Sequence, residues 1–383
     1  MTDDHRHIPG TLTGRGSVLH LIDTGGPGGA ETVFMQLAQR VRVGGLSPVT
    51  VVPREDWLSS GLRSHGLEPL ILNSRGAFNR PYIKALLRLV KERDVRLIHT
   101  HLLGSAVYGA LVGLVTRKPV VAVMHGPTDL RAPGRLAFVK RWLLKHGCSA
   151  LVAVSTSTRD ALIDFGIPER KITLIRNGVD TTAYVPGSAG DLRAELGLGP
   201  DDLLIGAVGN IRAPKAYEVL LRAAQLVLEK CPRACFAIVG EGNEAALRPL
   251  LHLCDELNIT GRVRFVGFRK SEAALFWNFD VFVSSSRSEG LSLAFLEAMA
   301  TARPIVATRS GGPQEAVVDG ESGVLVPIED PASLARALIE VLTDAGLRAR
   351  LGAAARQHVV ATFSLDVTVR SYEALYQRFT GSA

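Results

Sequence analysis

Two glutamates in the second half of the chain have the type and spacing for binding a hydroxyl-rich ligand. Glu289 lies in a polar loop beside Gly290, and Glu297 lies eight positions later within a run of helix-forming residues. The residues three and four positions from Glu297 are apolar or uncharged, so no local Lys or Arg pairs with it on a helix. Because a buried carboxylate without a partner is costly, we expect Glu297 to reach solvent, a distant donor or a ligand hydroxyl. An exposed glutamate on an amphipathic helix is the alternative.

Two cations have the spacing for binding an anion. Arg212 and Lys215 follow the apolar run 203–209, and Pro214 suits the first turn of a helix that we expect to end near Glu229. Positive side chains at a strand-to-helix junction, reinforced by the helix N-terminus, form an anion site.

The elements that position the two glutamates follow from the pattern around them. Val281 to Val283 is typical of a buried parallel strand, and a helix is expected from about Ser292 to Ala300. The order strand, loop and helix places Glu289 where open α/β sheets bind ligands.

The segment from Ser288 to Ala300 resembles the Glu-x7-Glu motif of retaining GT-B glycosyltransferases of glycosyltransferase family 4. The resemblance implies that Glu289 contacts the donor sugar and that Glu297 holds the nucleotide ribose. It also places Gly290, Leu291 and Ser292 in the donor site.

Arg212 and Lys215 resemble the family's pair that binds the donor diphosphate. Two positions depart from the family pattern: Asn210 stands where many members have Arg, and Ala216 replaces the usual Gly, so we expect a slightly altered loop.

The first half offers a weaker signal in the glycine-rich loop 25–31, which follows the strand pattern 18–22. Its glycines could cradle a phosphate, or simply form a tight turn. Glu31 occupies the third position of a dinucleotide fingerprint, and no P-loop lysine is present. The resemblance implies that Gly28 and Gly29 lie against the donor.

Further donor contacts are implied by the resemblance alone. His125, at the end of a strand pattern, matches a family histidine that contacts the donor sugar, and we include it with Glu289, Arg212 and Lys215 among the catalytic candidates. Gly240, Gly267 and Phe268 match loops that meet the nucleobase. His99 and His101 are interpreted as structural rather than metal ligands.

The whole chain alternates strand and helix patterns, which predicts an α/β fold with parallel sheets. With the resemblance, the expected fold is GT-B: two Rossmann-like domains that face a central cleft. We expect a polar tail (1–15), an acceptor domain (16–183), a nucleotide-sugar donor domain (184–364), and a C-terminal helix (365–383) that crosses back to the first domain.

Composition and sequence patterns indicate the expected cellular location. Residues 1–16 lack an apolar signal core, the apolar run 106–115 stops at Arg117 and Lys118, and four cysteines show no metal-ligand spacing. We therefore expect a cytoplasmic protein. Residues 1–183 hold 24 Lys and Arg against 14 Asp and Glu, whereas residues 184–383 hold 20 against 23.

The basic residues of the first half follow two predicted helices. Lys84, Arg88 and Lys91 form one stripe, and a second group spans residues 131–145 among bulky apolar side chains. Both suit a peripheral anionic membrane surface at the inner face. Solvated outer helix faces are the equal alternative.

The expected reaction is transfer of a sugar from a UDP- or GDP-linked donor to a glycan or lipid-linked acceptor, with retention at the anomeric carbon. We expect no cofactor, no metal and no nucleic acid. A nucleotide-sugar epimerase or a non-catalytic nucleotide-sugar-binding protein remains the alternative, and the failed glycine fingerprint disfavours an NAD oxidoreductase.

Overall fold

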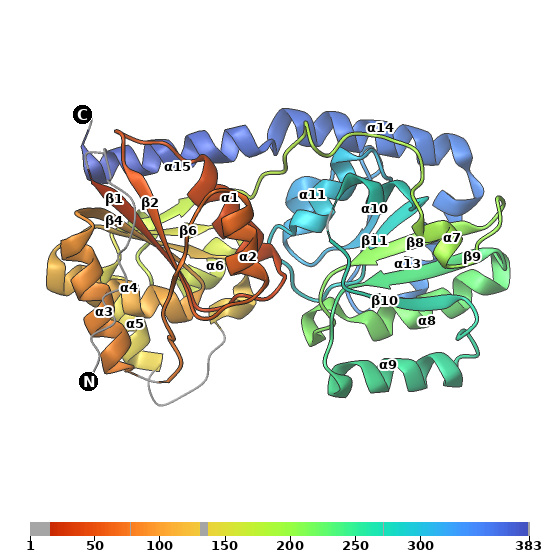
Figure 1. Cartoon of the computed structure of the whole chain (residues 1–383). Coiled ribbons are helices and arrows are strands. Elements are labelled where there is room, and N and C mark those ends of the chain that lie inside the picture. Colours follow the sequence, from red (N-terminus) through yellow and green to blue (C-terminus); the bar gives the residue numbers. More distant parts are fainter. Residues whose placement is uncertain (1–15, 77, 131–136, 271, 382–383) are drawn as a thin grey trace.

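The computed structural model describes residues 16–76, 78–130, 137–270 and 272–381. These residues form two domains that lie next to each other, the first coloured red to yellow and the second green to blue in Figure 1. The predicted polar tail (1–15) and two basic residues of the predicted membrane-facing group, Arg131 and Arg135, lie outside the described residues.

Seven parallel strands form the sheet of the first domain. They are β1 (Ser17–Ile22), β2 (Ser47–Val52), β3 (Leu70–Ile71), β4 (Val95–His101), β5 (Val120–Met124), β6 (Ala150–Ala153) and β7 (Ile172–Leu174). Their order across the sheet is β3-β2-β1-β4-β5-β6-β7.

Six parallel strands form the sheet of the second domain. They are β8 (Leu203–Val208), β9 (Ala234–Val239), β10 (Val263–Gly267), β11 (Val281–Ser284), β12 (Ile305–Thr308) and β13 (Val324–Val326). Their order is β10-β9-β8-β11-β12-β13.

Helices cover both faces of each sheet. In the first domain these are α1 (Gly29–Arg40), α2 (Trp57–Ser64), α3 (Arg80–Glu92), α4 (Leu103–Thr116), α5 (Ala137–Gly147) and α6 (Thr156–Asp164). In the second they are α7 (Leu192–Glu195), α8 (Tyr217–Lys230), α9 (Glu244–Glu256), α10 (Ala273–Trp277), α11 (Leu293–Ala300), α12 (Gly312–Ala316), α13 (Pro331–Thr343) and α14 (Ala345–Thr362).

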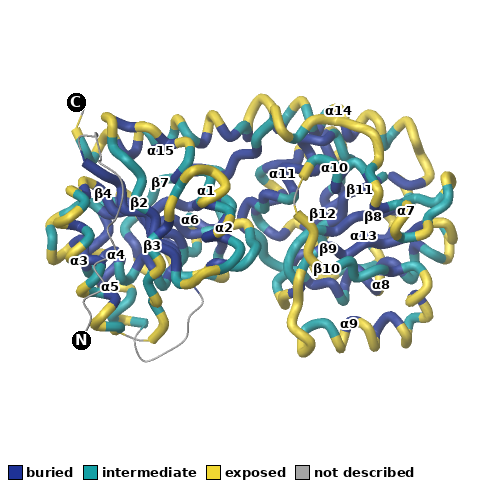
Figure 2. Tube along the Cα trace, viewed as in Figure 1, coloured by how far each residue is buried: buried dark blue, intermediate teal, exposed yellow. Residues whose placement is uncertain are grey.

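The strands are apolar at consecutive positions because both faces of each sheet are covered. In β5, Val121 and Val123 pack with α1, whereas Val120 and Ala122 pack with α3, α4 and α5 on the other face. The second sheet divides in the same way between α8, α9 and α13 on one face and α10, α11 and α14 on the other. Figure 2 shows the resulting buried centre in each domain.

The last helix, α15 (Leu365–Thr380), returns from the second domain to the first and lies along its sheet (Figure 1). Tyr372, Leu375 and Tyr376 are buried among side chains of β1, β4, β5 and α1. The Tyr376 hydroxyl lies 2.5 Å from His99 Nδ1 in β4. The helix therefore ties the two domains together by packing as well as by chain connection.

The chain order reverses between β1 and β4 in the first sheet and between β8 and β11 in the second. In an open parallel sheet, the loops at the carboxyl ends of such a strand pair diverge to opposite faces and leave a crevice. The glycine loop 25–28 follows β1, and the loops that carry Lys215 and Glu289 follow β8 and β11. Both crevices therefore contribute to one site.

Three details differ from the expectations. The helix predicted from Pro214 begins at Tyr217 instead, because Pro214 lies in a 3-10 turn (Ala213–Lys215) that ends at Ala216. An altered loop was expected at Ala216 and an ordinary backbone at Ala302, but both residues have positive φ, +49° and +58°, where glycine is usual and a β-carbon is strained. Strand β13, which is only three residues long, was not predicted.

The described cysteines are free thiols. No helix in the ranges given above combines the length and apolar character that crossing a bilayer requires.

We predict different effects on stability when the hydroxyl groups of the two buried tyrosines of α15 are removed. Tyr376→Phe leaves His99 Nδ1 without its partner, so the free energy of unfolding should fall by about 1–3 kcal/mol. Tyr372→Phe is the matched control, because the Tyr372 hydroxyl is buried with no hydrogen-bond partner among the described residues. Its removal should leave stability unchanged or slightly raised. Urea unfolding of both variants checks this, and equal losses would contradict the role of Tyr376.

Candidate active site

A cleft of about 360 Å³ lies between the facing sheet edges. It brings together twelve of the thirteen predicted site residues: Gly28, Gly29, His125, Arg212, Lys215, Gly240, Phe268, Glu289, Gly290, Leu291, Ser292 and Glu297. Gly267 does not line the cleft, but its carbonyl accepts a hydrogen bond from the Gly240 amide (2.9 Å) and so positions the loop that does.

Glu289 and Lys215 form an ion pair at the centre of the second domain's side of the cleft. Lys215 Nζ lies 2.5 Å from Glu289 Oε2, which also accepts a hydrogen bond from the Ser286 hydroxyl (3.2 Å). The Lys215 and Glu289 side chains are 22% and 17% exposed, so both reach the cleft while remaining largely enclosed. The pair holds each charge in place before a ligand arrives.

The loops that carry this ion pair are fixed to each other through their backbones. The Ser285 hydroxyl donates to the Lys215 carbonyl (2.9 Å), and the Arg287 amide donates to the Pro214 carbonyl (2.8 Å). The Arg287 guanidinium also pairs with Glu218 and Glu329 on the outer side. These contacts support the loop around Ala216 despite its left-handed backbone.

Arg212 is the cation of the cleft that stays available. It is exposed, and within the described part of the chain its guanidinium makes no hydrogen bond or ion pair. Its neighbour Asn210 crosses to the first domain, where Nδ2 donates to the Pro27 carbonyl (3.1 Å). Where many family members have an arginine, this chain therefore has an interdomain contact.

Glu297 is only 5% exposed, which is inconsistent with the alternative of a surface glutamate. It lies on α11, whose first residues border the cleft together with Ser292. No side chain caps the N-terminus of this helix, so the amides of its first turn are available to an anion.

Gly290 brings the two domains into backbone contact. A β-carbon at this position would lie 2.1 Å from the His125 carbonyl oxygen, so only glycine fits. Close by, Asn177 Nδ2 donates to the Leu291 carbonyl (2.7 Å), and Arg176 pairs with Glu315 (2.8 Å). The domains are therefore in direct contact beside the cleft.

His125 presents its backbone rather than a charged ring to this contact. Its Nε2 is hydrogen-bonded to His101 Nδ1 (3.0 Å), and its amide donates to Asp129 Oδ2 (2.7 Å). Desolvation lowers the His125 pKa to about 4, so the ring is neutral near pH 7. His99 and His101 lie buried behind it, and no group of three or more His, Cys, Asp or Glu within the described ranges is arranged to hold a metal ion.

The cleft also contains residues that the sequence analysis did not assign to the site: Glu31, Trp57, Asp129 and Asn177. Glu31 was considered only as a departure from a glycine fingerprint. Asp129 lies four positions after His125 in a polar loop. A single carboxylate in a short loop did not by itself indicate a site. Trp57 and Asn177 reach the cleft only through the tertiary fold.

The comparisons with known proteins agree on one family. Residues 27–183 match the family described as "Glycosyltransferase Family 4", and residues 202–344 match "Glycosyl transferases group 1". A protein of Thermobifida fusca named D-inositol 3-phosphate glycosyltransferase is 32% identical, over 78% of this chain and 73% of its own length. A protein of the same name from Corynebacterium urealyticum is 33% identical over 65% of this chain, and the match spans 61% of that relative.

Solved structures share the architecture. The Anabaena protein HepE in complex with UDP-glucose aligns with a TM-score of 0.83 and 23% identity, over 95% of this chain and 100% of that chain. Sucrose-phosphate synthase of Thermosynechococcus elongatus aligns with a TM-score of 0.78 and 21% identity, over 96% of this chain and 100% of that chain. At this level of identity the likeness establishes the two-domain fold.

Proposed function

Since the chain belongs to the family 4, group 1 glycosyltransferases and has their GT-B fold, we propose that it transfers a sugar from a nucleoside-diphosphate sugar to an acceptor hydroxyl with retention at the anomeric carbon. One observation supports this most strongly. Glu289, Glu297, Arg212 and Lys215, which are far apart in sequence, line one cleft between the two domains.

The cations neutralise the departing diphosphate in this proposal. Arg212 pairs with none of the described residues, and Lys215 is held by Glu289. The open N-terminus of α11 adds backbone donors on the same side of the cleft. A hydrogen bond to a charged group contributes roughly 1.5–3 kcal/mol. Such fixed positive groups stabilise charge that develops on the leaving group without a metal ion.

The glutamates orient the donor. Glu289 accepts hydrogen bonds from the sugar hydroxyls, and Glu297 accepts from the ribose, so the reacting carbon is held in one place. His125 supplies its backbone beside Gly290 and a neutral ring. Retention in one step puts the acceptor on the face that the diphosphate leaves, where a phosphate oxygen can take the acceptor proton as the new carbon–oxygen bond forms.

The donor base is proposed to be uracil, because HepE was solved with UDP and UDP-glucose. Gly240 and Phe268 line the cleft, and we place the base against them. A GDP-linked donor is the alternative. The acceptor is proposed to be a glycan or a lipid-linked glycan.

A panel of nucleotide sugars, each incubated with and without sugar acceptors, tests the function. Product formation that needs an acceptor, with the α- or β-configuration of the donor preserved in the NMR spectrum, is the expected result. Conversion of the donor alone would identify an epimerase, and binding without turnover would identify a non-catalytic protein.

Glu289→Gln and Glu297→Gln should differ in the step that they affect. Glu289→Gln frees Lys215 of its counter-ion, so UDP should bind at least as tightly as to wild type while turnover falls by about 10²-fold or more. Glu297→Gln removes a ribose contact and should lower the affinity for UDP itself by about tenfold. Calorimetric titration with UDP distinguishes them; equal affinities in all three proteins would exclude the ribose role.

Activity should persist in EDTA, because Arg212, Lys215 and the α11 N-terminus supply the positive charge at the diphosphate. In the same assay, Lys215→Ala should lower kcat by about 10²-fold or more, since a donor to the leaving group is lost. A strict requirement for Mg²⁺ or Mn²⁺ would contradict the metal-free mechanism, and a wild-type rate for Lys215→Ala would remove that residue from the site.

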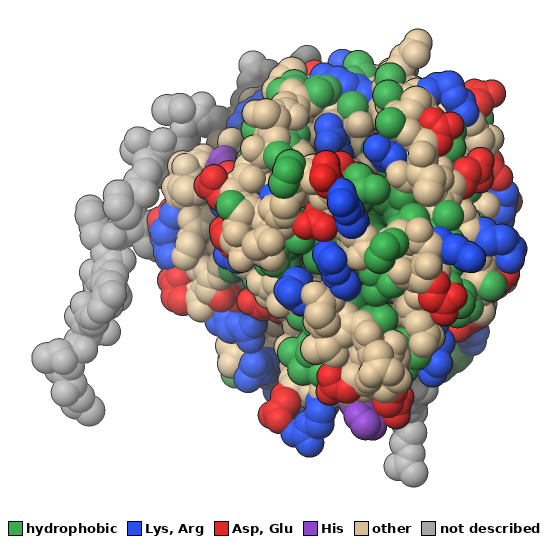
Figure 3. Space-filling model, turned by 90° about the vertical axis from the view of Figure 1, so that its right-hand side faces the viewer, with side chains coloured by type: hydrophobic (Ala, Val, Ile, Leu, Met, Phe, Trp, Pro, Cys, Tyr) green, Lys and Arg blue, Asp and Glu red, His purple; other side chains and the backbone are tan. Residues whose placement is uncertain are grey.

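Peripheral membrane binding is the proposed location of the first domain. On α5, Phe138 and Trp142 are 66% and 47% exposed, beside the basic residues Arg141 and Lys145. Val115, at the end of the adjoining α4, is 62% exposed. Apolar side chains among cations are typical of a surface that meets anionic lipid. The end of the molecule formed by the second domain instead shows acidic and basic side chains interspersed (Figure 3).

Vesicles rich in anionic lipid should sediment the protein at low salt and release it at high salt, because each Lys or Arg near the surface contributes about 1 kcal/mol. The double variant Phe138→Ser, Trp142→Ser should lose this binding. Ile328→Ser, which removes an exposed apolar side chain from the second domain, is the matched control. Wild-type protein that stays in solution with such vesicles at low salt would contradict the membrane proposal.

A further inference from the structure

The side of the cleft opposite the donor site has an unusual charge. This side is formed by residues of the first domain, among them Thr24, Glu31, Trp57, Thr128 and Asp129. The first domain is strongly basic overall, yet none of its described residues that border the cleft is a Lys or Arg. Its charged members there are the carboxylates of Glu31 and Asp129.

Glu31 is enclosed, and none of the described residues pairs with it. It is 9% exposed and lies in the first turn of α1, where its carboxylate covers Gly28: a β-carbon on Gly28 would be 2.4 Å from Glu31 Oε2. Within the described residues no hydrogen bond or ion pair engages this carboxylate, although it borders the cleft. A buried carboxylate needs donors, so a ligand with hydroxyl groups is the natural source.

Asp129 is held with one oxygen toward the backbone. Its Oδ2 accepts from the amides of His125 (2.7 Å) and Gly126 (3.1 Å), and its other oxygen has no protein donor among the described residues. Burial raises the pKa of Asp129, against a lowering influence from Arg212 on the donor side. Burial also raises the pKa of nearby Asp23 to about 6, with further increases from the charges of Asp129 and Glu31.

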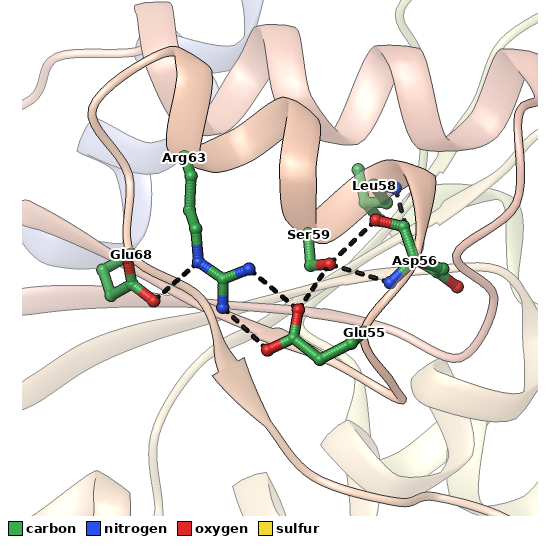
Figure 4. Close-up of polar contacts among 6 residues, drawn as sticks. All are labelled: Glu55, Asp56, Leu58, Ser59, Arg63 and Glu68. Atoms are coloured by element: carbon green, nitrogen blue, oxygen red, sulfur yellow. Dashed lines mark hydrogen bonds and ion pairs between the residues drawn. The ribbon is translucent and has the colours of Figure 1, made fainter.

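Trp57 lines the same cleft as these carboxylates and provides an aromatic surface. It is the first residue of α2, whose N-terminus is fixed by the contacts in Figure 4. The Asp56 amide donates to the Ser59 hydroxyl (2.9 Å), and both oxygens of Glu55 accept from the Arg63 guanidinium (2.8 Å each). The Leu58 amide donates to the Gly25 carbonyl (2.9 Å), which fixes α2 to the glycine loop.

The charges on the two sides of the cleft limit which acceptors can bind. A phosphate or carboxylate on the acceptor would face Glu31 and Asp129, and like charges in a poorly hydrated cleft disfavour binding strongly. A cationic acceptor would instead face Arg212 and Lys215 across the cleft. An uncharged sugar avoids both conflicts, because its hydroxyls donate to the carboxylates and its apolar face can lie on an aromatic ring.

We propose that the acceptor group bound in this cleft is an uncharged sugar, with Glu31 and Asp129 accepting its hydroxyl hydrogens and Trp57 contacting its apolar face. This rests on the proposed glycosyl transfer. It distinguishes the chain from the relatives whose name specifies D-inositol 3-phosphate. Glu31 and Asp129 are then specificity-determining residues.

The test uses UDP-glucose with matched acceptors: myo-inositol and its 3-phosphate, glucose and its 6-phosphate, alkyl glucosides and maltosides, L-malate, and glucosamine. Transfer should favour the uncharged member of each pair by at least about tenfold in kcat/KM. Preference for a phosphate, for malate or for glucosamine would overturn the proposal. So would the absence of transfer to every uncharged sugar.

Glu31→Gln and Asp129→Asn test the assigned carboxylates. Each should lower, by about fivefold, the ratio of kcat/KM for the uncharged acceptor to kcat/KM for the phosphorylated one. The reason is that one repulsive charge is removed while the side-chain shape remains. Glu169→Gln removes the same charge from the surface of the first domain and should leave the preference unchanged. An unchanged preference in both cleft variants would overturn their role.

Donor binding provides a separate readout. UDP should raise the Tm of both cleft variants at least as much as that of wild type, because each substitution removes a negative charge from the cleft, and UDP-glucose should be hydrolysed slowly without acceptor. If these hold while the acceptor preference is reversed, the neutral-acceptor inference fails and the glycosyltransferase proposal stands. If UDP neither binds nor is released, both fail.

Discussion

The contact between Gly290 and the His125 carbonyl is the constraint on which the site depends. It joins the loop after β11 to the end of β5 without an intervening side chain, and any larger residue would separate them. Because this approach brings the two switch points together, residues of both domains line one cleft. Asn177 and Asn210 hold the same approach by hydrogen bonds to backbone carbonyls across the interface.

The charges that line the cleft differ between the two domains. The second domain contributes both signs, Arg212, Lys215 and Arg269 with Glu289 and Glu297, whereas the charged residues of the first are the carboxylates Glu31 and Asp129. Overall composition would suggest the reverse, since the first half of the chain is the basic one. Some of its described cations lie on helices such as α3 and α5, and none of its described cations borders the cleft. The net charge of the first half therefore does not predict the charges with which it lines the cleft.

Behind the cleft lies a group of buried, neutral histidines. Burial lowers the pKa of His20 to about 3 and keeps the pKa values of His99 and His101 well below the usual range. These rings pack as aromatic side chains between the sheet and α15, where Tyr376 contacts His99. The helix that crosses back from the second domain is therefore anchored directly behind His125.

The sequence by itself determined the α/β alternation, the two parallel sheets and the cluster of Glu289, Glu297, Arg212 and Lys215. Long apolar strands and an eight-residue glutamate spacing are local signals, and the family resemblance converted them into a site. Only the tertiary structure decided that Glu31, Trp57 and Asp129 share the cleft, because their proximity arises from loops of different strands meeting at one edge. The family pattern marked Ala216 as the replacement of a glycine, but only the structure shows that Ala216 and Ala302 keep a left-handed backbone, because the surrounding fold imposes that conformation.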